Sequence, residues 1–343
     1  MDHLLDLTPV QLTALMAKLG QPPFRAKQIA SWVYQRGAAD FAAMSDLPAE
    51  LRTHLVGEMS VMSGKTVTRN ETPDGVTKLL VEFADGQRVE SVLIPAQNRN
   101  TACVSTQVGC GMNCTFCASG AAGLERNLTG GEIVEQVLHL QAATGQKVTH
   151  VVFMGMGEPL ANYDATLFAV RAMIDPQRLG ISARHITVST VGLPKAIRQL
   201  AAENIPLTLA ISLHAPSDAL RAKIIPKAGG IHIEEIIRAA QEFYQSRHRE
   251  VTLEYMLIAG VNDTNVCAEG LARIAQQLRC SVNLIRYNPV PSASYEAPSA
   301  AAVRMFAQRL ERRGVNVLIR KSRGQEADAA CGQLRRRVGP EAK

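Results

Sequence analysis

Apolar residues recur every three to four positions through the first 60 residues of the chain, a spacing that predicts helices. Thr8 and Pro9 suit the N-cap and the first turn of a helix whose apolar stripe ends at Gly20. A second helix is predicted to end near Gly37, and a third to follow Pro48. The N-terminal part of the chain is therefore expected to be helical.

Apolar and polar positions then alternate, which is typical of strands. Residues 77–83 and 88–95 flank Asp85-Gly86, a dipeptide that favours the tight turn of a hairpin. We interpret residues 1–97 as an N-terminal helical accessory domain that ends in a small β extension.

From residue 101 onward, short apolar strands alternate with amphipathic helices. One of these helices is expected to begin at Thr129, because Thr129 and Glu132 have the spacing of a capping box. The repeated order of strand and helix implies a parallel sheet with helical crossovers. Strands are predicted at residues 101–105, 150–153, 185–189, 207–213, 252–258, 281–287 and 315–319.

Six or seven such units are too few for a closed eight-stranded barrel. We therefore expect an α/β fold with a partial (β/α)6 barrel over residues 98–322, and a doubly wound sheet is the competing arrangement. In either fold the functional residues collect at the carboxyl ends of the strands. Residues 323–343 are interpreted as a basic C-terminal tail.

The composition narrows the class of protein. A hydrophobic content of 46% with 20% charged residues excludes a mostly disordered chain. The N-terminus lacks the pattern of a secretory signal, and no apolar stretch reaches the roughly 18 residues of a spanning helix. We expect a cytoplasmic protein without membrane contact. In a reducing compartment, its seven cysteines suit metal binding or catalysis better than structural disulfides.

Cys110, Cys114 and Cys117 form the pattern C-x3-C-x2-C directly after a predicted strand. Three thiolates in one short loop can hold three irons of a [4Fe-4S] cluster and leave the fourth iron without a protein ligand. That open iron can bind S-adenosylmethionine, whose cleavage gives a 5′-deoxyadenosyl radical. Structural zinc needs four ligands, and no fourth Cys or His lies close by in the sequence. The alternative is three unrelated buried or zinc-binding thiols.

The cluster spacing, with Phe116 before the last cysteine, resembles the radical S-adenosylmethionine superfamily. Further segments narrow the resemblance to the RlmN/Cfr family of RNA methyltransferases, nearest to its RlmN branch. Ser119 and Ala327 depart from the usual Thr and Ile of the family, and neither departure removes a functional group. The segments are Cys103-Val-Ser-Thr-Gln-Val-Gly-Cys110, Arg126-Asn-Leu-Thr129, Gly155-Met-Gly-Glu-Pro-Leu160, Ile211-Ser-Leu-His-Ala215 and Ala329-Ala-Cys331-Gly-Gln-Leu334.

The resemblance implies methylation of carbon 2 of an adenine in the peptidyl-transferase region of 23S rRNA, and of the adenine 3′ of the anticodon in tRNA. Carbon 2 is not a nucleophile, so a methyl group carried by the protein and activated as a radical is required. Two S-adenosylmethionine molecules would be used, with Cys331 as the S-methylcysteine intermediate, Cys103 as the resolving thiol and Glu90 as the proton acceptor. Taken alone, these residues are more simply interpreted as a free tail thiol, a buried strand thiol and a solvent-facing carboxylate.

Several residues at predicted strand ends are implied contacts of S-adenosylmethionine. In Gly157-Glu158 the glycine allows close backbone approach, and the carboxylate can receive the ammonium of the ligand. His214 could instead be a satisfied structural histidine. The remaining implied contacts are Ser189, Ser212, Leu213 and Asn288.

The charge of the chain is concentrated at its C-terminal end. The net charge of the whole chain is +6, but residues 301–343 hold eleven basic and four acidic residues, a balance of +7. Cationic segments at 312–313, 320–323 and 335–337 bracket Cys331 and favour contact with RNA, although a solvated charged tail is the simpler alternative. Carbon 2 is accessible only in an unstacked or flipped adenine. The predicted partners are 23S rRNA, tRNA and an electron donor such as flavodoxin, and the protein is expected to be a monomer.

Three other functions compete with methylation of carbon 2. The first is Cfr-like methylation of carbon 8, which uses the same set of cysteines. The second is a radical S-adenosylmethionine enzyme that does not act on RNA, for which Cys331 would be dispensable. The third is a non-enzymatic iron–sulfur or zinc protein that binds RNA, which would form no 5′-deoxyadenosine.

Overall fold

The structure is a computed structural model that describes residues 2–320, 324 and 328–334. Its helices are α1 (Pro9–Lys18), α2 (Phe24–Tyr34), α3 (Ala49–Glu58), α4 (Ala118–Ala121), α5 (Gly130–Thr144), α6 (Tyr163–Ile174), α7 (Pro194–Ala202), α8 (Asp218–Ile224), α9 (Ile233–Arg247), α10 (Asn265–Ala275) and α11 (Ala300–Arg312). Its strands are β1 (Asp2–His3), β2 (Met59–Ser60), β3 (Gly64–Glu71), β4 (Thr77–Phe83), β5 (Arg88–Ala96), β6 (Arg99–Cys103), β7 (Gln107–Gly109), β8 (Leu124–Asn127), β9 (His150–Phe153), β10 (Ile186–Thr190), β11 (Thr208–Ser212), β12 (Val251–Leu257), β13 (Cys280–Arg286) and β14 (Val317–Arg320).

The main sheet has the strand order β14-β13-β12-β11-β10-β9-β6-β5-β4-β3. All strands from β6 to β14 in this sheet are parallel, and each pairs with the next one along the chain. A doubly wound sheet would reverse its strand order at a switch point, and this sheet does not. The structure therefore confirms the partial barrel, with β3, β4 and β5 as an antiparallel extension of the same sheet.

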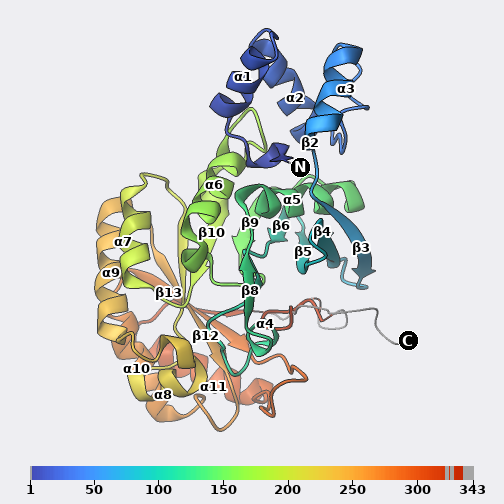
Figure 1. Cartoon of the computed structure of the whole chain (residues 1–343). Helices are drawn as coiled ribbons and strands as arrows, with labels where there is room; N and C mark the ends of the chain where they lie inside the picture. Colours follow the sequence, from blue (N-terminus) through green and yellow to red (C-terminus); the bar gives the residue numbers. More distant parts are fainter. Residues whose placement is uncertain (1, 321–323, 325–327, 335–343) are drawn as a thin grey trace.

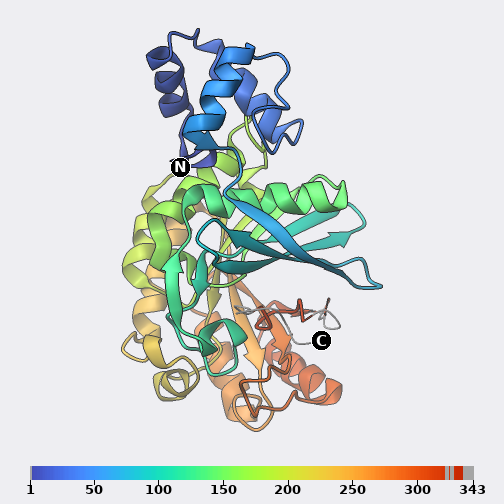
Figure 2. The same cartoon turned by 45° about the vertical axis from the view of Figure 1, so that its right-hand side comes forward.

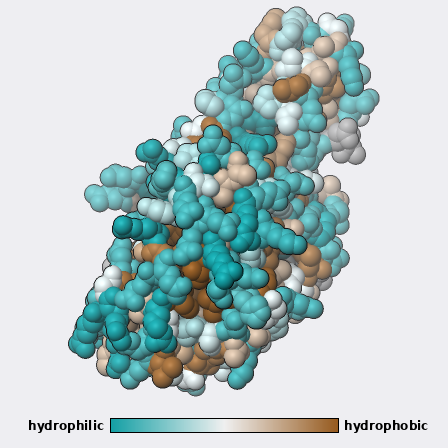
Figure 3. Space-filling view, turned by 90° about the vertical axis from the view of Figure 1, so that its left-hand side faces the viewer, coloured by the Kyte–Doolittle hydropathy of each residue, from teal (hydrophilic) through white to brown (hydrophobic). Residues whose placement is uncertain are grey.

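The crossover helices lie on the outer side of the curved sheet, and α1, α2 and α3 form a separate group at one end (Figures 1 and 2). Each parallel strand leads into its helix and back, so that all these helices cover one face. Viewed from the side of α7 and α9, the surface is mostly hydrophilic with smaller apolar patches (Figure 3). The opposite, inner face of the sheet is left for the functional site. No described helix is long and apolar enough to cross a membrane.

The strands predicted from the apolar pattern are present, with boundaries that differ by no more than two residues. The hairpin around Asp85-Gly86 is confirmed, and Gly86 has a φ of +78°. The capping boxes at Thr8 and Thr129 are formed. Strand β3 was not predicted, because its residues are mostly polar and exposed and show no apolar alternation.

Candidate active site

The three clustered cysteines lie in the loop that follows the first parallel strand, β6. Cys110 directly follows β7, and Cys117 is the N-cap residue of α4. Together with Cys114 they line a cavity of about 130 Å³, which we call the cluster cavity. Predicted site residues from four other segments also line it, namely Gly157, Glu158, Ser189, Ser212, His214 and Cys331.

A left-handed glycine shapes the start of this loop. Gly109 has a φ of +79°, and a Cβ atom there would lie 2.0 Å from the carbonyl oxygen of Gly123. The amide of Cys110 donates a hydrogen bond to the same oxygen at 2.9 Å. A side chain at position 109 would therefore separate β7 from β8 and displace Cys110.

The environment of the three thiols fits a metal cluster. Burial raises the pKa of all three, and that of Cys110 to about 12, so that a bound cation is needed to hold them as thiolates at neutral pH. Within the described residues no three donors converge on a single metal ion. A [4Fe-4S] cube requires no such convergence, because each cysteine binds a different iron. When bound there with S-adenosylmethionine, such a cluster supplies one-electron reductive cleavage.

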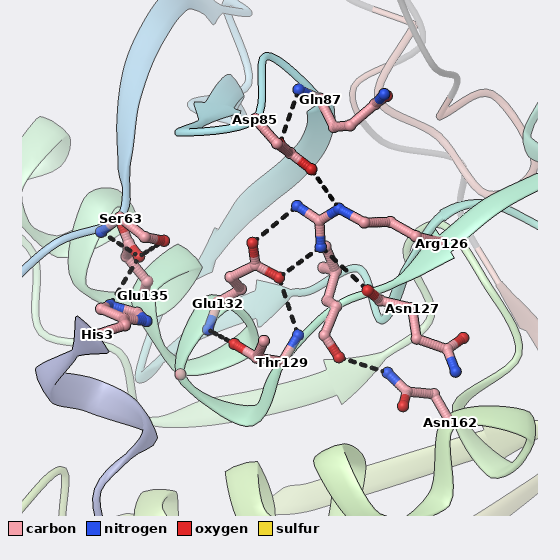
Figure 4. Close-up of polar contacts among 12 residues, drawn as sticks. His3, Ser63, Asp85, Gln87, Arg126, Asn127, Thr129, Glu132, Glu135 and Asn162 are labelled. Carbon is pink, nitrogen blue, oxygen red and sulfur yellow. Dashed lines mark hydrogen bonds and ion pairs between the residues drawn. The ribbon is translucent and has the colours of Figure 1, made fainter. Parts of the chain in front are cut away.

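Arg126 fastens the end of the cysteine loop to two other elements (Figure 4). Its guanidinium donates hydrogen bonds of 2.8 Å to both carboxylate oxygens of Glu132 on α5, and a further one to Asp85 at the hairpin turn. The carboxylate of Glu132 also accepts the N–H of Thr129 at 2.9 Å in the capping box. The Arg126-to-Thr129 motif therefore positions the cysteine loop relative to the β extension.

A second buried network joins the N-terminal segment to α5 (Figure 4). Glu135 accepts backbone hydrogen bonds from Ser63 at 3.0 Å and from Gly64 at 2.7 Å, and its Oε2 lies 3.2 Å from Nε2 of His3. Burial would lower the pKa of His3, but its hydrogen bonds to Asp6 and Glu135 raise it to about 9. The ion pair therefore ties the accessory domain to the barrel.

Gly157 and Glu158 form one wall of the cluster cavity. Gly157 has a φ of +101°, and a Cβ atom there would lie 2.6 Å from Cβ of Gln107. The carboxylate of Glu158 accepts the N–H groups of Leu160 at 3.0 Å and of Val191 at 2.8 Å. Burial raises the pKa of Glu158 to about 7. Because each carboxylate oxygen can accept two hydrogen bonds, Glu158 has capacity left for a ligand ammonium.

Ser189 and Ser212 lie at the ends of the neighbouring strands β10 and β11, and their hydroxyl oxygens are 3.3 Å apart. Leu213 is fully buried and does not line the cluster cavity. His214 has a φ of +58°, and its Nδ1 accepts the N–H of Met256 at 3.0 Å. Burial lowers the pKa of His214 to about 3, so the ring is neutral and carries its proton on Nε2. His214 therefore supports the strand end whether or not it contacts a ligand.

The segment around Cys331 lies between the cysteine loop and the end of β13. The N–H of Ala118, the residue after Cys117, donates to the carbonyl oxygen of Gly332 at 2.8 Å. The side-chain amide of Asn288 donates to the carbonyl oxygen of Cys331 at 3.1 Å. Asn288, predicted to contact the cofactor, thus holds the main chain of Cys331 and does not line the cluster cavity.

A larger cavity of about 730 Å³, which we call the barrel cavity, fills the interior of the partial barrel. Cys103 lines it, and so does Cys331, which therefore borders both cavities. Burial raises the pKa of Cys103 to about 12, and interaction with Cys331 adds to this rise. Both thiols are free. Polar side chains from successive strands complete the wall, namely Thr101, Thr187, Thr208, Thr252 and Asn283.

Glu90 lies on β5 and does not line either cavity. The next residue on the same face of that strand, Val92, is opposite Cys103 on β6. Oε1 of Glu90 is 3.1 Å from Nζ of Lys78 on β4, and both side chains are almost fully buried. Lys78 also donates to the carbonyl oxygen of Asp328 at 3.2 Å. Glu90 is therefore part of a buried ion pair that is linked to the Cys331 segment.

The basic residues predicted to contact RNA are only partly described. Arg312 and Arg313 are exposed at the end of α11, and Arg320 ends β14 and borders both cavities. The segments 321–323 and 335–337 lie outside the described residues. The sequence did not mark Lys78 as part of the site, because it is only a charged residue on a strand with no local motif. Arg320 was predicted only as part of a cationic segment that contacts RNA, and its place between the two cavities follows from the fold.

Comparisons with known proteins agree with this architecture. The family model of the radical SAM superfamily matches residues 104–268, and that of the ribosomal RNA large subunit methyltransferase N-terminal domain matches residues 3–61. A solved radical SAM methyltransferase from Sphaerobacter thermophilus is 44% identical, with a TM-score of 0.95 over 98% of this chain and 99% of that one.

Two curated relatives are each named "Probable dual-specificity RNA methyltransferase RlmN". The relative from Rhodopirellula baltica is 46% identical over 98% of this chain and 92% of its own length. The relative from Symbiobacterium thermophilum is 48% identical over 96% of this chain and 90% of its own length. At this identity and coverage, the chain belongs to the RlmN family of radical S-adenosylmethionine methyltransferases.

Proposed function

We propose that the protein methylates carbon 2 of an adenine in 23S rRNA and in tRNA, with Cys331 as the carrier of the methyl group. The observation that supports this most directly is the position of Cys331, which borders the cluster cavity and the barrel cavity. A carrier must meet both the methyl source and the substrate base. The relatives named as dual-specificity RNA methyltransferases support RNA as the substrate.

In this proposal the thiol of Cys331 first takes a methyl group from one S-adenosylmethionine, and a second molecule supplies the radical that removes a hydrogen atom from the S-methyl group. The remaining carbon bonds to carbon 2 of the adenine and forms a covalent link between protein and RNA. The hydrogen bonds from Ala118 and Asn288 hold the main-chain carbonyl groups of Gly332 and Cys331 during these steps. They keep its sulfur at the boundary between the two cavities.

Cys103 and Glu90 are proposed to complete the reaction. Glu90 accepts the proton that carbon 2 loses, and Lys78 compensates the charge of its carboxylate while the two are buried. The adduct then holds one extra electron, which it would return to the oxidised cluster. Cys103 as a thiolate next attacks the sulfur of Cys331: the S–S bond forms as the bond from that sulfur to carbon breaks, and the released carbon takes up a proton to become the methyl group on the base. The electrostatic interaction between the two thiols supports their proximity. The disulfide must be reduced before the next cycle.

The three cluster cysteines are proposed to hold a [4Fe-4S] cluster, and Gly157, Glu158, Ser189, Ser212 and His214 to surround S-adenosylmethionine. Leu213 and Asn288 are proposed to contribute from the neighbouring strand ends.

We further propose that an electron donor such as flavodoxin reduces the cluster and that the protein acts as a monomer in the cytoplasm. Contacts with RNA phosphates would make binding dependent on salt concentration.

Nucleoside analysis tests this proposal. The reconstituted, reduced protein is incubated without oxygen with S-adenosylmethionine and unmodified 23S rRNA fragments or tRNA, and a Cys117→Ala variant serves as the cluster-free control. We expect 2-methyladenosine from both RNAs by mass spectrometry. If 8-methyladenosine is the only methylated nucleoside found, the Cfr-like alternative replaces the proposal. 5′-Deoxyadenosine without RNA methylation would exclude an RNA substrate, and no 5′-deoxyadenosine would exclude radical chemistry.

A further inference from the structure

Glu254 on β12 is a buried carboxyl group that the reaction proposed above does not use. Its exposed fraction is 3%. Oε1 accepts a hydrogen bond of 2.9 Å from the side-chain amide of Asn283 on β13. Oε2 is buried and has no hydrogen-bond partner in the described part of the chain. Such an oxygen is rare in a folded protein, because a buried polar atom that loses its water and gains no partner is destabilising.

The position of Glu254 suggests what its partner is. Glu254 lines both the cluster cavity and the barrel cavity, and within the described residues Cys331 and Arg320 are among the few others that do so. The guanidinium of Arg320 interacts electrostatically with Cys331, Glu254 and Cys103, so these four side chains surround one small region. This is where the carbon on Cys331 would meet carbon 2 of the adenine.

The geometry also favours a particular protonation state. Because Asn283 donates to Oε1, a proton on the carboxyl group resides on Oε2. Burial raises the pKa of Glu254, although Arg320 and Asn283 act in the opposite direction. The groups that face it are Arg320, Cys103 and Cys331. A neutral carboxylic acid at this position is a hydrogen-bond donor for which the described residues provide no acceptor.

In adenine, carbon 2 lies between N1 and N3, and both ring nitrogens are hydrogen-bond acceptors. The sugar is attached beside N3, and the sugar–phosphate chain remains outside the pocket when a base is flipped in. N1 is on the opposite edge of the base and therefore enters deepest. We propose that Glu254 donates a hydrogen bond from Oε2 to N1 of the substrate adenine and thereby activates carbon 2. This inference rests on the proposed function.

A hydrogen bond to N1 should speed the addition of the radical because it makes carbon 2 electron-poor. A carbon-centred radical of the alkylthio-methyl type is electron-rich, and it adds faster to a carbon that is electron-poor. A proton shared with N1 draws electron density from carbon 2, and the hydrogen bond strengthens as the addition places negative charge on N1. The proton returns to Oε2 when the carbon 2 proton and the extra electron of the radical adduct have left and the ring is aromatic again. Over the whole cycle Glu254 therefore has no net gain or loss of protons.

The test compares three RNA oligonucleotides with adenine, 1-deazaadenine or 3-deazaadenine at the target position. Each is given to the wild-type protein, Glu254→Ala and Glu254→Gln under single-turnover conditions, and the rate of methylation is measured. On adenine, Glu254→Ala should be about 100-fold slower, the effect of removing one donor to a developing charge. Glu254→Gln should recover part of the rate, because its amide N–H can still donate to N1.

The base analogues separate this role from a merely structural one. The penalty of Glu254→Ala should disappear on 1-deazaadenine, which lacks the acceptor, and persist on 3-deazaadenine, which keeps it. An equal penalty on all three bases, or none on adenine, would overturn the inference. Iron content and thermal unfolding report whether the variants fold. If Glu254→Ala does not fold, the methylation rates of wild type and Glu254→Gln on the three bases are compared instead, and the same two outcomes support or overturn the inference. A wild-type protein that leaves adenine unmethylated would instead refute the proposed function.

Discussion

Replacement of Cys331 by alanine is expected to abolish methylation of RNA, with a loss on the order of 10⁴-fold or more, because Cys331 is the only described cysteine that borders both cavities. The fold and the cluster should be retained, since Cys331 is only partly buried and its loop is held through main-chain hydrogen bonds. Radioactive methyl transfer to RNA measures the loss. Iron content and the formation of 5′-deoxyadenosine measure what remains.

Cys280→Ala is the matched control for this experiment. Cys280 is the first residue of β13 and lines neither cavity. Its removal should leave methylation unchanged within about 2-fold, as expected for a substitution away from the site. Substantial methylation by Cys331→Ala would show that the methyl group reaches RNA without this thiol.

Replacement of Cys103 by alanine should instead stop the reaction after the carbon on Cys331 has bonded to the adenine. The carbon still bonds to the adenine, but the sulfur of Cys331 has no partner for disulfide formation, so each enzyme molecule remains attached to its RNA. A slowly migrating protein–RNA species should accumulate on denaturing gels, and nuclease digestion followed by mass spectrometry should place the nucleotide on Cys331. Methylated RNA should be reduced to a small fraction.

The double variant Cys103→Ala, Cys331→Ala supplies the control for the trapped species. It should form none, because the atom that bonds the base is absent. If Cys103→Ala instead releases methylated RNA at the normal rate, Cys103 has no part in resolving the adduct. Cys103, which is buried on β6, would then contribute only to packing.

Much of the fold could be predicted because the apolar pattern of the parallel strands is strong. Their residues are buried and branched, as in β11, and the helices between them carry clear apolar stripes. The N-cap and proline at Thr8-Pro9 and the capping box at Thr129 marked helix starts for the same local reason. Strand β3 could not be predicted, because it pairs along an edge with mostly exposed polar residues.

The candidate site was predictable where its chemistry is local. Cys110, Cys114 and Cys117 are marked by their spacing, and the structure places all three on one cavity. The pairing of Glu90 with Lys78 was not predictable, since it depends on the register of two strands and on burial. The same holds for Glu254, whose Oε1 pairs with Asn283 on β13 and whose Oε2 is buried without a hydrogen-bond partner among the described residues. Such contacts arise from tertiary structure and leave no short motif in the sequence.

The most direct test of the central claim follows the carbon on Cys331. The protein is first loaded with a ¹³C-methyl group on this thiol, freed from S-adenosylmethionine and mixed with unlabelled S-adenosylmethionine and RNA. A single turnover is then analysed by mass spectrometry of the nucleosides. We predict that the first 2-methyladenosine formed carries ¹³C. A first product without the label would contradict the claim that Cys331 carries the methyl group to the base.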